Sequence, residues 1–296
     1  LVRTALHHLQ RTAYHDVNWR PNLLIFGGSP ARRRYLLEMG AALVQERGLT
    51  SYVQMLEGEV AELARERRSQ GRRLDELRVE YPNVFFRADI VPDVYRGIVT
   101  VTQSYGIGSL QANTVMLGWL NKRERADSYF RTLRDLTDLE NTLMLLKYDE
   151  QRRFGTRRNI HIWWGGLERN GGMMLLMAYL MVSHHAWRQA KVTILTVVND
   201  ESDVARAEER LKRVFESARL EAQPRVLLRN GQKLTDLIAE NSGEADLAII
   251  GLRLPREDED PGKLFDHYNE LLRGLPTTLL VHSGGEFNAA PVLFDD

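Results

Sequence analysis

The sequence predicts an α/β protein built from two similar halves, each with a parallel sheet of about five strands between layers of helices. Three observations lead to this fold class. Short apolar runs alternate with helix-length segments along the chain, and the alternation starts again near the middle. The length of 296 residues also suits two domains of ordinary size.

The first half begins with an apolar run from Leu23 that ends in Gly27 and Gly28. Ser29 followed by Pro30 is a typical helix start, because serine caps free amide groups and proline fits the first helical position. We expect this helix to reach about residue 47 and to stop at Gly48. The later strands are expected at 51–56, 84–88, 114–117 and 142–147, and the helices at about 59–77, 94–105 and 125–136.

The second half repeats this order from a strand at 160–164, which ends in Gly165 and Gly166. A turn at 170–172 should lead into a helix from 173 to about 189. Its segment 173–182 is apolar all round, so we expect it to be buried on more than one side, against the other half or a second subunit. The later strands are expected at 192–197, 225–228, 246–250 and 277–282, and the helices at about 203–218, 233–241 and 262–272.

Matching segments of the two halves lie at nearly constant offsets. Residues 112–118 correspond to 245–251 at an offset of 133, and Gly28 corresponds to Gly166 at an offset of 138. These offsets predict a duplicated unit, with a helical connector at 1–17, a first half at 18–150 and a second half at 151–296. Because crossovers are right-handed, the strand order 3-2-1-4-5 is expected in each half.

Composition excludes several classes of protein. Forty basic and forty acidic residues cancel, which argues against a dedicated nucleic-acid binder. Cysteine is absent, so disulfides and thiol nucleophiles are excluded. The longest apolar run has ten residues, at 173–182, whereas a membrane span needs about 20. We therefore expect no membrane-spanning helix in this chain, and no signal peptide.

The glycines after the first strand are the candidate ligand site. Gly27, Gly28 and Ser29 would place amide groups at a helix N-terminus, where anions bind. They form neither a dinucleotide fingerprint nor a P-loop, so a tight strand-to-helix turn is the favoured reading and a nucleotide or other anion the weaker one.

No residue pattern predicts catalysis. The acidic run 256–260 could chelate a hard cation, but a solvated loop is favoured. We find no metalloprotease motif and no nucleophile elbow. The sequence therefore predicts no catalytic residues, no metal site and no cofactor.

Three segments together carry a family resemblance. Residues 18–27 lead into the first strand, 106–118 combine a glycine-rich loop with a strand, and 160–164 read Ile-His-Ile-Trp-Trp before Gly171, Gly172 and a Met/Leu-rich helix. In this order they resemble the cytosolic C-terminal domain of the cation-chloride cotransporters, with Ala112 where the family usually has proline. The resemblance spans roughly 18–282 and, with no long low-complexity insertion, fits a prokaryotic member.

The resemblance implies a fold of two halves similar to universal stress proteins. It also implies a non-catalytic cytosolic domain for regulation and dimerisation, at the cytoplasmic face of a membrane transporter that moves Na or K with Cl. Its partners would be its own transmembrane domain, outside this chain, and a second copy in a homodimer. The stress-protein nucleotide loop is not recognisable after Gly251, so any nucleotide should bind weakly. The alternative is a soluble tandem nucleotide-binding protein of the universal stress class, and an enzyme ranks third.

Overall fold

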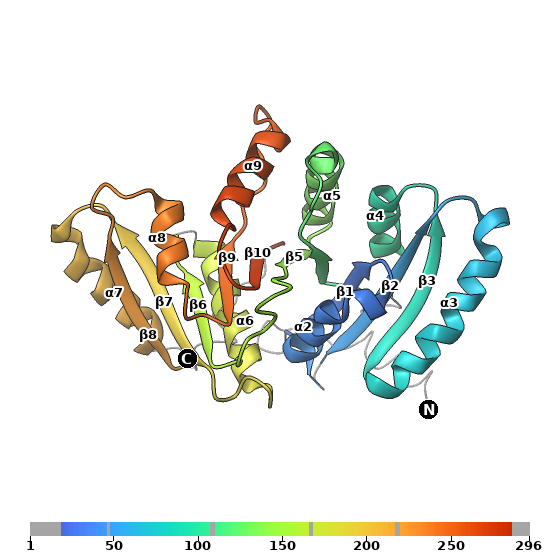
Figure 1. The fold of residues 1–296 in the computed structure, drawn as a ribbon, viewed down its shortest axis with the longest axis horizontal. Coiled ribbons are helices and arrows are strands. Elements are labelled where there is room, and N and C mark those ends of the chain that lie inside the picture. Colours follow the sequence, from blue (N-terminus) through green and yellow to red (C-terminus); the bar gives the residue numbers. More distant parts are fainter. Residues whose placement is uncertain (1–18, 46–47, 107–109, 166–167, 217–219, 286–296) are drawn as a thin grey trace. The chain divides into compact units, whose positions relative to one another are not determined.

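The computed structural model describes residues 19–45, 48–106, 110–165, 168–216 and 220–285 (Figure 1). Their contacts divide the chain into two compact units that interleave in sequence. Within the described residues, unit 1 holds the chain up to Gly118 with Ser128–Met144 and residues 284–285, and unit 2 holds Trp119–Asp127 with the chain from Leu145 to Ser283. The division at residue 150 stays a prediction, and the connector at 1–17 lies outside the described residues.

Strands and helices alternate along the first half of the chain. In order they are β1 (Asn22–Gly27), the 3-10 helix η2 (Pro30–Arg32), α2 (Arg34–Val44), β2 (Leu49–Glu57), α3 (Val60–Glu80), β3 (Val84–Val91), α4 (Val94–Ser104), β4 (Thr114–Gly118), η3 (Arg123–Arg125), α5 (Ala126–Asp138) and β5 (Thr142–Lys147).

The second half has the same alternation. Its elements are β6 (Asn159–Trp163), α6 (Glu168–Ser183), β7 (Lys191–Val198), η4 (Glu201–Asp203), α7 (Val204–Glu216), β8 (Ala222–Leu228), α8 (Leu234–Asn241), β9 (Leu247–Gly251), α9 (Pro261–Leu271) and β10 (Thr278–His282).

The strand order is the same in both halves. It reads β3-β2-β1-β4-β5 in the first and β8-β7-β6-β9-β10 in the second, so the predicted order 3-2-1-4-5 is confirmed. The central strand β1 runs parallel to β2 and β4, and β6 runs parallel to β7 and β9. Thr114 opposite Leu23 and Leu247 opposite Ile160 hold equivalent positions, 133 residues apart on β4 and β9.

Helices cover both faces of the strands. Gly40 of α2 packs against Ile25 and Leu23 and near Thr50, whereas Gly97 of α4 packs against Met55 and Val91. Thr50 and Met55 are an odd number of residues apart on β2, so they point to opposite faces. The α/β fold with a three-layer arrangement is thus as the sequence predicts.

Helix α6 starts earlier than the sequence suggests. The expected turn at 170–172 is helical, because α6 begins at Glu168, and the helix ends at Ser183 rather than near 189. Gly171 is needed there for space, since a Cβ on it would come within 2.8 Å of Cζ3 of Trp164. Gly171 thus admits a tryptophan ring to the first turns of the helix, and the helix continues through Gly171 and Gly172.

The apolar side chains of α6 are buried inside this one chain. Residues 173–178 are at most 2% exposed. Burial therefore needs no second subunit, and this helix gives no local reason for dimerisation. Within the described segments no helix has the length and apolar character that crossing a membrane requires.

The edge strand β3 has two of its outer carbonyl groups bound by arginines of α3. Arg67 Nε donates to the carbonyl oxygen of Ala88 at 2.7 Å, and Arg78 Nη2 donates to that of Phe86 at 3.3 Å. Exposed edge carbonyls are a template for pairing with another chain. These two bonds therefore protect that edge.

The segment between the two halves is bound to unit 2 through Asp246, at the start of β9. Its carboxylate accepts hydrogen bonds from the backbone N–H of Thr156 (2.9 Å), Arg158 (2.7 Å) and Asn159 (3.0 Å), and from the Thr156 hydroxyl (3.1 Å). Arg152 adds bonds from its guanidinium to the carbonyl oxygens of Gly243 and Ala245. Residues 152–159 thus form part of the packed structure of unit 2.

Candidate functional site

The predicted glycine site lies at the carboxyl end of β1, where ligands bind in folds of this type. Its backbone is not that of a helix N-terminus. Ser29 precedes a 3-10 helix of three residues and makes no side-chain cap, and the α-helix begins only at Arg34. The amides of Arg32 and Arg33 are already bonded to the carbonyls of Ser29 and Pro30. The expected α-helix start at Pro30 is therefore wrong, and two of the amides of this turn are engaged within it.

Side chains of unit 1 itself occupy the space between the ends of β1 and β4. A Cβ on Gly27 would collide with the Tyr52 hydroxyl, and one on Gly118 would lie 2.9 Å from Nη1 of Arg33. Tyr52 donates to the carbonyl oxygen of Gly28 at 3.0 Å. Gly27 and Gly118 therefore make room for Tyr52 and Arg33, whereas Gly28 is exposed and has open space beside it, so the anion site stays a prediction.

Two buried tyrosines donate hydrogen bonds to carbonyl groups at this end of unit 1. Tyr129 donates to the carbonyl oxygen of Gly118 at 3.1 Å, as Tyr52 does to Gly28. Burial raises the pKa of both hydroxyls above the ordinary value for tyrosine. Both act as neutral donors at physiological pH, so Arg33 is the charged group closest to Gly118.

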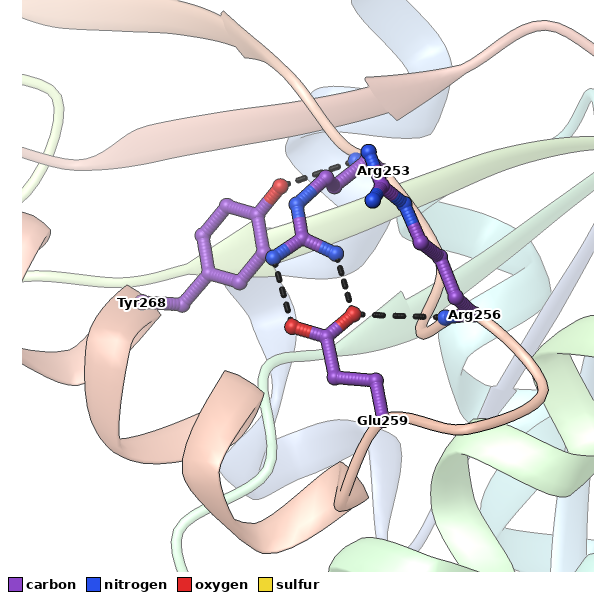
Figure 2. Close-up of polar contacts among 4 residues, drawn as sticks. All are labelled: Arg253, Arg256, Glu259 and Tyr268. Atoms are coloured by element: carbon purple, nitrogen blue, oxygen red, sulfur yellow. Dashed lines mark hydrogen bonds and ion pairs between the residues drawn. The ribbon is translucent and has the colours of Figure 1, made fainter.

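The loop after β9 occupies the corresponding place in unit 2, and an ion pair closes it (Figure 2). Arg253 contacts Glu259 through both of its terminal nitrogens, at 2.7 Å for Nη2 to Oε1, and the Arg256 amide donates to Glu259 Oε2 at 3.2 Å. The backbone N–H of Arg253 donates to the Tyr268 hydroxyl at 2.8 Å. The hydrogen bonds from Arg253 lower the pKa of Glu259 to about 2, so this carboxylate is charged at all ordinary pH values.

The acidic run 256–260 is used within this loop. Besides Glu259 in its ion pair, Asp260 caps α9 by accepting from the amide of Gly262 at 2.7 Å. Over the parts of the chain that the structure describes, no three His, Asp or Glu side chains cluster as metal ligands would. Glu259 and Asp260 are thus engaged in contacts inside this loop.

Asn170 is a buried residue of this region that the sequence reasoning missed. From the first turn of α6 its Nδ2 donates to the carbonyl oxygen of Leu252 at 2.8 Å, and its Oδ1 accepts from the amide of Ser283 at 2.9 Å. It therefore joins the ends of β9 and β10. An asparagine just before Gly171 and Gly172 is the one sequence feature that could have indicated this role. The same feature is also typical of a turn, so it does not distinguish the two.

A cavity of about 690 Å³ opens beside these groups, at the carboxyl ends of β6, β7 and β9. It lies entirely within unit 2. Trp164, Val198 and Gly251 mark the three strand ends, and α6, η4, α7, α8 and α9 supply the remaining walls. No sequence pattern indicates this cavity, because its lining comes from eight elements that only the fold brings together.

We predict that ATP and ADP bind weakly or not at all and that ATP is not hydrolysed. The turn after β1 lacks a complete phosphate motif, Tyr52 and Arg33 pack against Gly27, and Arg253 is engaged by Glu259 in the loop after β9. Calorimetric titration of the chain with ATP should give no heat consistent with micromolar binding. A dissociation constant of about 1 μM or lower, near 8 kcal/mol of binding free energy, would overturn the prediction.

Comparison with solved structures shows the fold class of the chain. Its structure is similar to a universal stress protein from Archaeoglobus fulgidus DSM 4304, with a TM-score of 0.63, 10% identity, and coverage of 92% of this chain and 100% of that one. A putative universal stress protein from Pseudomonas aeruginosa UCBPP-PA14 is similar over 90% and 94% of the two chains, with 10% identity and a TM-score of 0.55. The tandem arrangement similar to universal stress proteins is thereby confirmed as a fold.

A narrower likeness follows from the sequence itself. The model of solute carrier family 12 matches residues 149–233. The structure is also similar to the cytoplasmic domain of a prokaryotic cation chloride cotransporter, with a TM-score of 0.67, 20% identity, and coverage of 92% of this chain and 98% of that domain. The predicted resemblance to this cotransporter domain is therefore confirmed.

Proposed function

We propose that this chain is the non-catalytic cytosolic domain of a cation-chloride cotransporter, and that it regulates and dimerises the transporter. The observation that carries the proposal is the family-model match at 149–233, since it rests on the sequence and is independent of the fold likeness. It covers the Asp246-bound segment together with β6, α6, β7, α7 and β8. The fold likeness to a cotransporter's cytoplasmic domain over 92% of the chain supports it.

Such a domain acts through differential binding. It can change transport only if it contacts two states of the membrane part with different free energies. Its partner would be the transmembrane domain of the same protein, which carries the sites for Na or K and Cl, and its place is the cytoplasmic face of the membrane. Within unit 2 the segment 152–159 is held to the start of β9 by Asp246.

Two observations test the proposal: the reading frame upstream of this sequence and the ion uptake of cells that express the full protein. The reading frame upstream of Leu1 should encode a permease of about twelve helices. In cells that express the full protein, deletion of residues 19–285 should change chloride-dependent uptake of rubidium or sodium, whereas Asn199→Ala, a change at an exposed side chain, should not. Unchanged uptake in the deletion variant, at equal membrane abundance, would refute a regulatory role.

The second candidate is a soluble tandem nucleotide-binding protein of the universal stress class. The fold likeness over the full length of the Archaeoglobus protein favours it. It requires a reading frame without a membrane part and measurable nucleotide affinity. An upstream permease together with a flat ATP titration would exclude this candidate.

We expect the isolated chain to self-associate into a homodimer. The reason is the resemblance to transporters that work as dimers, since the buried α6 adds none. Sedimentation equilibrium at micromolar concentration should give twice the 34.1 kDa chain mass. If the membrane part supplies most of the effective concentration, association would be weaker. A 34.1 kDa monomer at the highest concentration would contradict self-association of the isolated domain.

A further inference from the structure

Helix α3 of unit 1 has one face that packs on the protein and one that is exposed. Leu74 is 2% exposed, and Arg67 and Arg78 reach the edge strand β3, where they bind carbonyl groups. Figure 1 shows α3 lying along β3. The face of α3 opposite these residues therefore points to solvent.

Arginines follow that exposed face at helical spacing. Arg65, Arg68 and Arg72 are three and four residues apart and all are exposed, so they form one stripe on the helix surface. Arg72 precedes the buried Leu74 by two residues, which is about 200° around the helix axis. The arginine stripe, defined as these three arginines, thus lies opposite the buried face. It is about 10 Å long at the rise of an α-helix.

The charge of the arginine stripe is not neutralised by ion pairs. Within the described parts of the chain, no carboxylate lies at ion-pair distance from its three guanidinium groups. Residues 65–73 contain five arginines and a single acidic residue, Glu66. Glu62 and Glu76 flank the stripe but do not pair with it. This part of α3 therefore carries local positive charge that is free to attract an anionic partner.

An apolar side chain continues the arginine stripe. Val79 follows Arg72 by seven residues, about two helical turns, so it lies on the same face of α3. It is 86% exposed, which is unusual for a large apolar side chain. A side chain of this kind can enter the headgroup region of a bilayer while basic residues beside it bind lipid phosphates.

We propose that the arginine stripe binds the phosphate groups of anionic lipids, with α3 lying along a membrane surface. A guanidinium group binds phosphate oxygens through paired N–H donors, and an exposed helix face fits a flat surface. Over the whole chain, forty basic and forty acidic residues cancel, so the attraction is local to α3 and suits a long polyanion such as nucleic acid less well. The inference rests on the proposed function only in that a transporter domain has a membrane beside it.

Co-sedimentation of the 296-residue chain with lipid vesicles tests this proposal. At low salt the chain should bind vesicles of phosphatidylcholine and phosphatidylserine in equal parts, and should not bind vesicles of phosphatidylcholine alone. The triple variant Arg65→Gln/Arg68→Gln/Arg72→Gln should lower partitioning onto the anionic vesicles about a hundredfold, at about fivefold for each arginine. Absence of binding by the wild type, or equal binding by the triple variant, would overturn the proposal.

A matched control separates the position of the charges from their number. Arg131→Gln/Arg188→Gln/Arg273→Gln removes the same charge from exposed positions outside α3 and should keep most of the binding. Equal loss in the two triple variants would show that net charge alone drives the binding, and would overturn the assignment to α3.

The absence of cysteine allows the contact to be located with a single label. Val79→Cys, labelled with a polarity-sensitive fluorophore, should shift its emission to shorter wavelength on anionic vesicles. The same label on Gln189→Cys, an exposed position of unit 2, should not shift. An unshifted label at Val79 on the bound chain would place another surface on the membrane and overturn the proposal.

Two further outcomes keep this inference apart from its alternatives. Binding of an oligonucleotide in place of vesicles, lost in the variant of the arginine stripe, would assign α3 to nucleic acid and overturn the proposal. If the chain does not bind anionic vesicles although a permease is encoded upstream, the inference fails and the proposed function stands. Vesicle binding through α3 without an upstream permease would support the inference and refute the proposed function.

Discussion

Replacement of Asp246 by alanine is expected to lower the free energy of unfolding by at least about 3 kcal/mol, because it leaves buried amide groups without acceptors. The Asp246 residue is 8% exposed, and its carboxylate is the acceptor for three backbone N–H groups and one hydroxyl between Thr156 and Asn159. Each unsatisfied buried donor costs about 1–3 kcal/mol. Water that enters the vacated space recovers part of this loss, so we expect the lower end of the range for each donor.

Urea denaturation measures this loss. Asp246→Asn keeps one acceptor oxygen and should fall between alanine and the wild type. The matched control is Asp258→Ala, since Asp258 is an exposed acidic residue of the loop after β9, and its effect should stay within about 0.5 kcal/mol. If Asp246→Ala were no more destabilising than Asp258→Ala, the described hydrogen bonds would not hold the segment to unit 2.

The same carboxylate makes stability depend on pH. Burial favours the neutral form, but the amides of Arg158, Thr156 and Asn159 and the Thr156 hydroxyl outweigh it and hold the pKa of Asp246 below its ordinary value. A lowered pKa means that the unfolded chain takes up the proton first. The contribution is therefore complete above the unfolded pKa of about 3.9 and is lost as pH falls through the folded value. The stability difference between wild type and Asp246→Asn should narrow below about pH 4.

His161 on β6 also makes the folded state less stable as the pH falls, but in a higher pH range than Asp246 does. Burial lowers its pKa, and its Nδ1 has no hydrogen-bond partner among the described residues. The unfolded chain therefore binds this proton first, and stability falls as pH drops below about 6.5. The Asp246 variants retain His161, so its contribution cancels from their difference.

The order of strands could be predicted because local signals and topology agree. Apolar runs that end in glycine, such as the run up to Gly27, fix the strand ends, and right-handed crossovers then leave few topologies. The start of α6 could not be predicted, because Gly171-Gly172 reads as a turn until the Trp164 ring is known to pack there. The packing of a residue seven positions earlier decides whether those glycines break the helix.

The site was less predictable than the fold for the same reason. The sequence suggests Gly27 as an anion-binding residue, because a glycine after a strand can expose backbone amide groups. In the structure Gly27 instead packs against Arg33 and against Tyr52 of the next strand. Arg206 and Arg210 belong to a helix with the pattern of a solvated surface element, and only the fold brings them beside the tryptophans of β6. Sequence patterns locate the strand ends, whereas the chemistry at those ends comes from side chains on several elements.

Replacement of Asn170 by alanine is expected to lower the free energy of unfolding by about 2 kcal/mol and to loosen the ends of β9 and β10. Asn170 is 6% exposed, and its amide bonds to both Leu252 and Ser283. The carbonyl of Leu252 keeps a second contact, with Nδ1 of His282 at 3.0 Å. Among the described residues the amide of Ser283 has no such substitute, so most of the loss should come from that donor.

Hydrogen exchange separates this local effect from a general loss of stability. In Asn170→Ala the amide of Ser283 should exchange faster by more than the change in global unfolding accounts for, because its acceptor is gone. The amide of Arg253 should follow the global change alone, since it donates to Tyr268 and not to Asn170. Asn199→Ala, a change at an exposed asparagine near the end of β7, should alter neither amide. Unchanged exchange at Ser283 in the Asn170 variant would show that this side chain does not join the two strand ends.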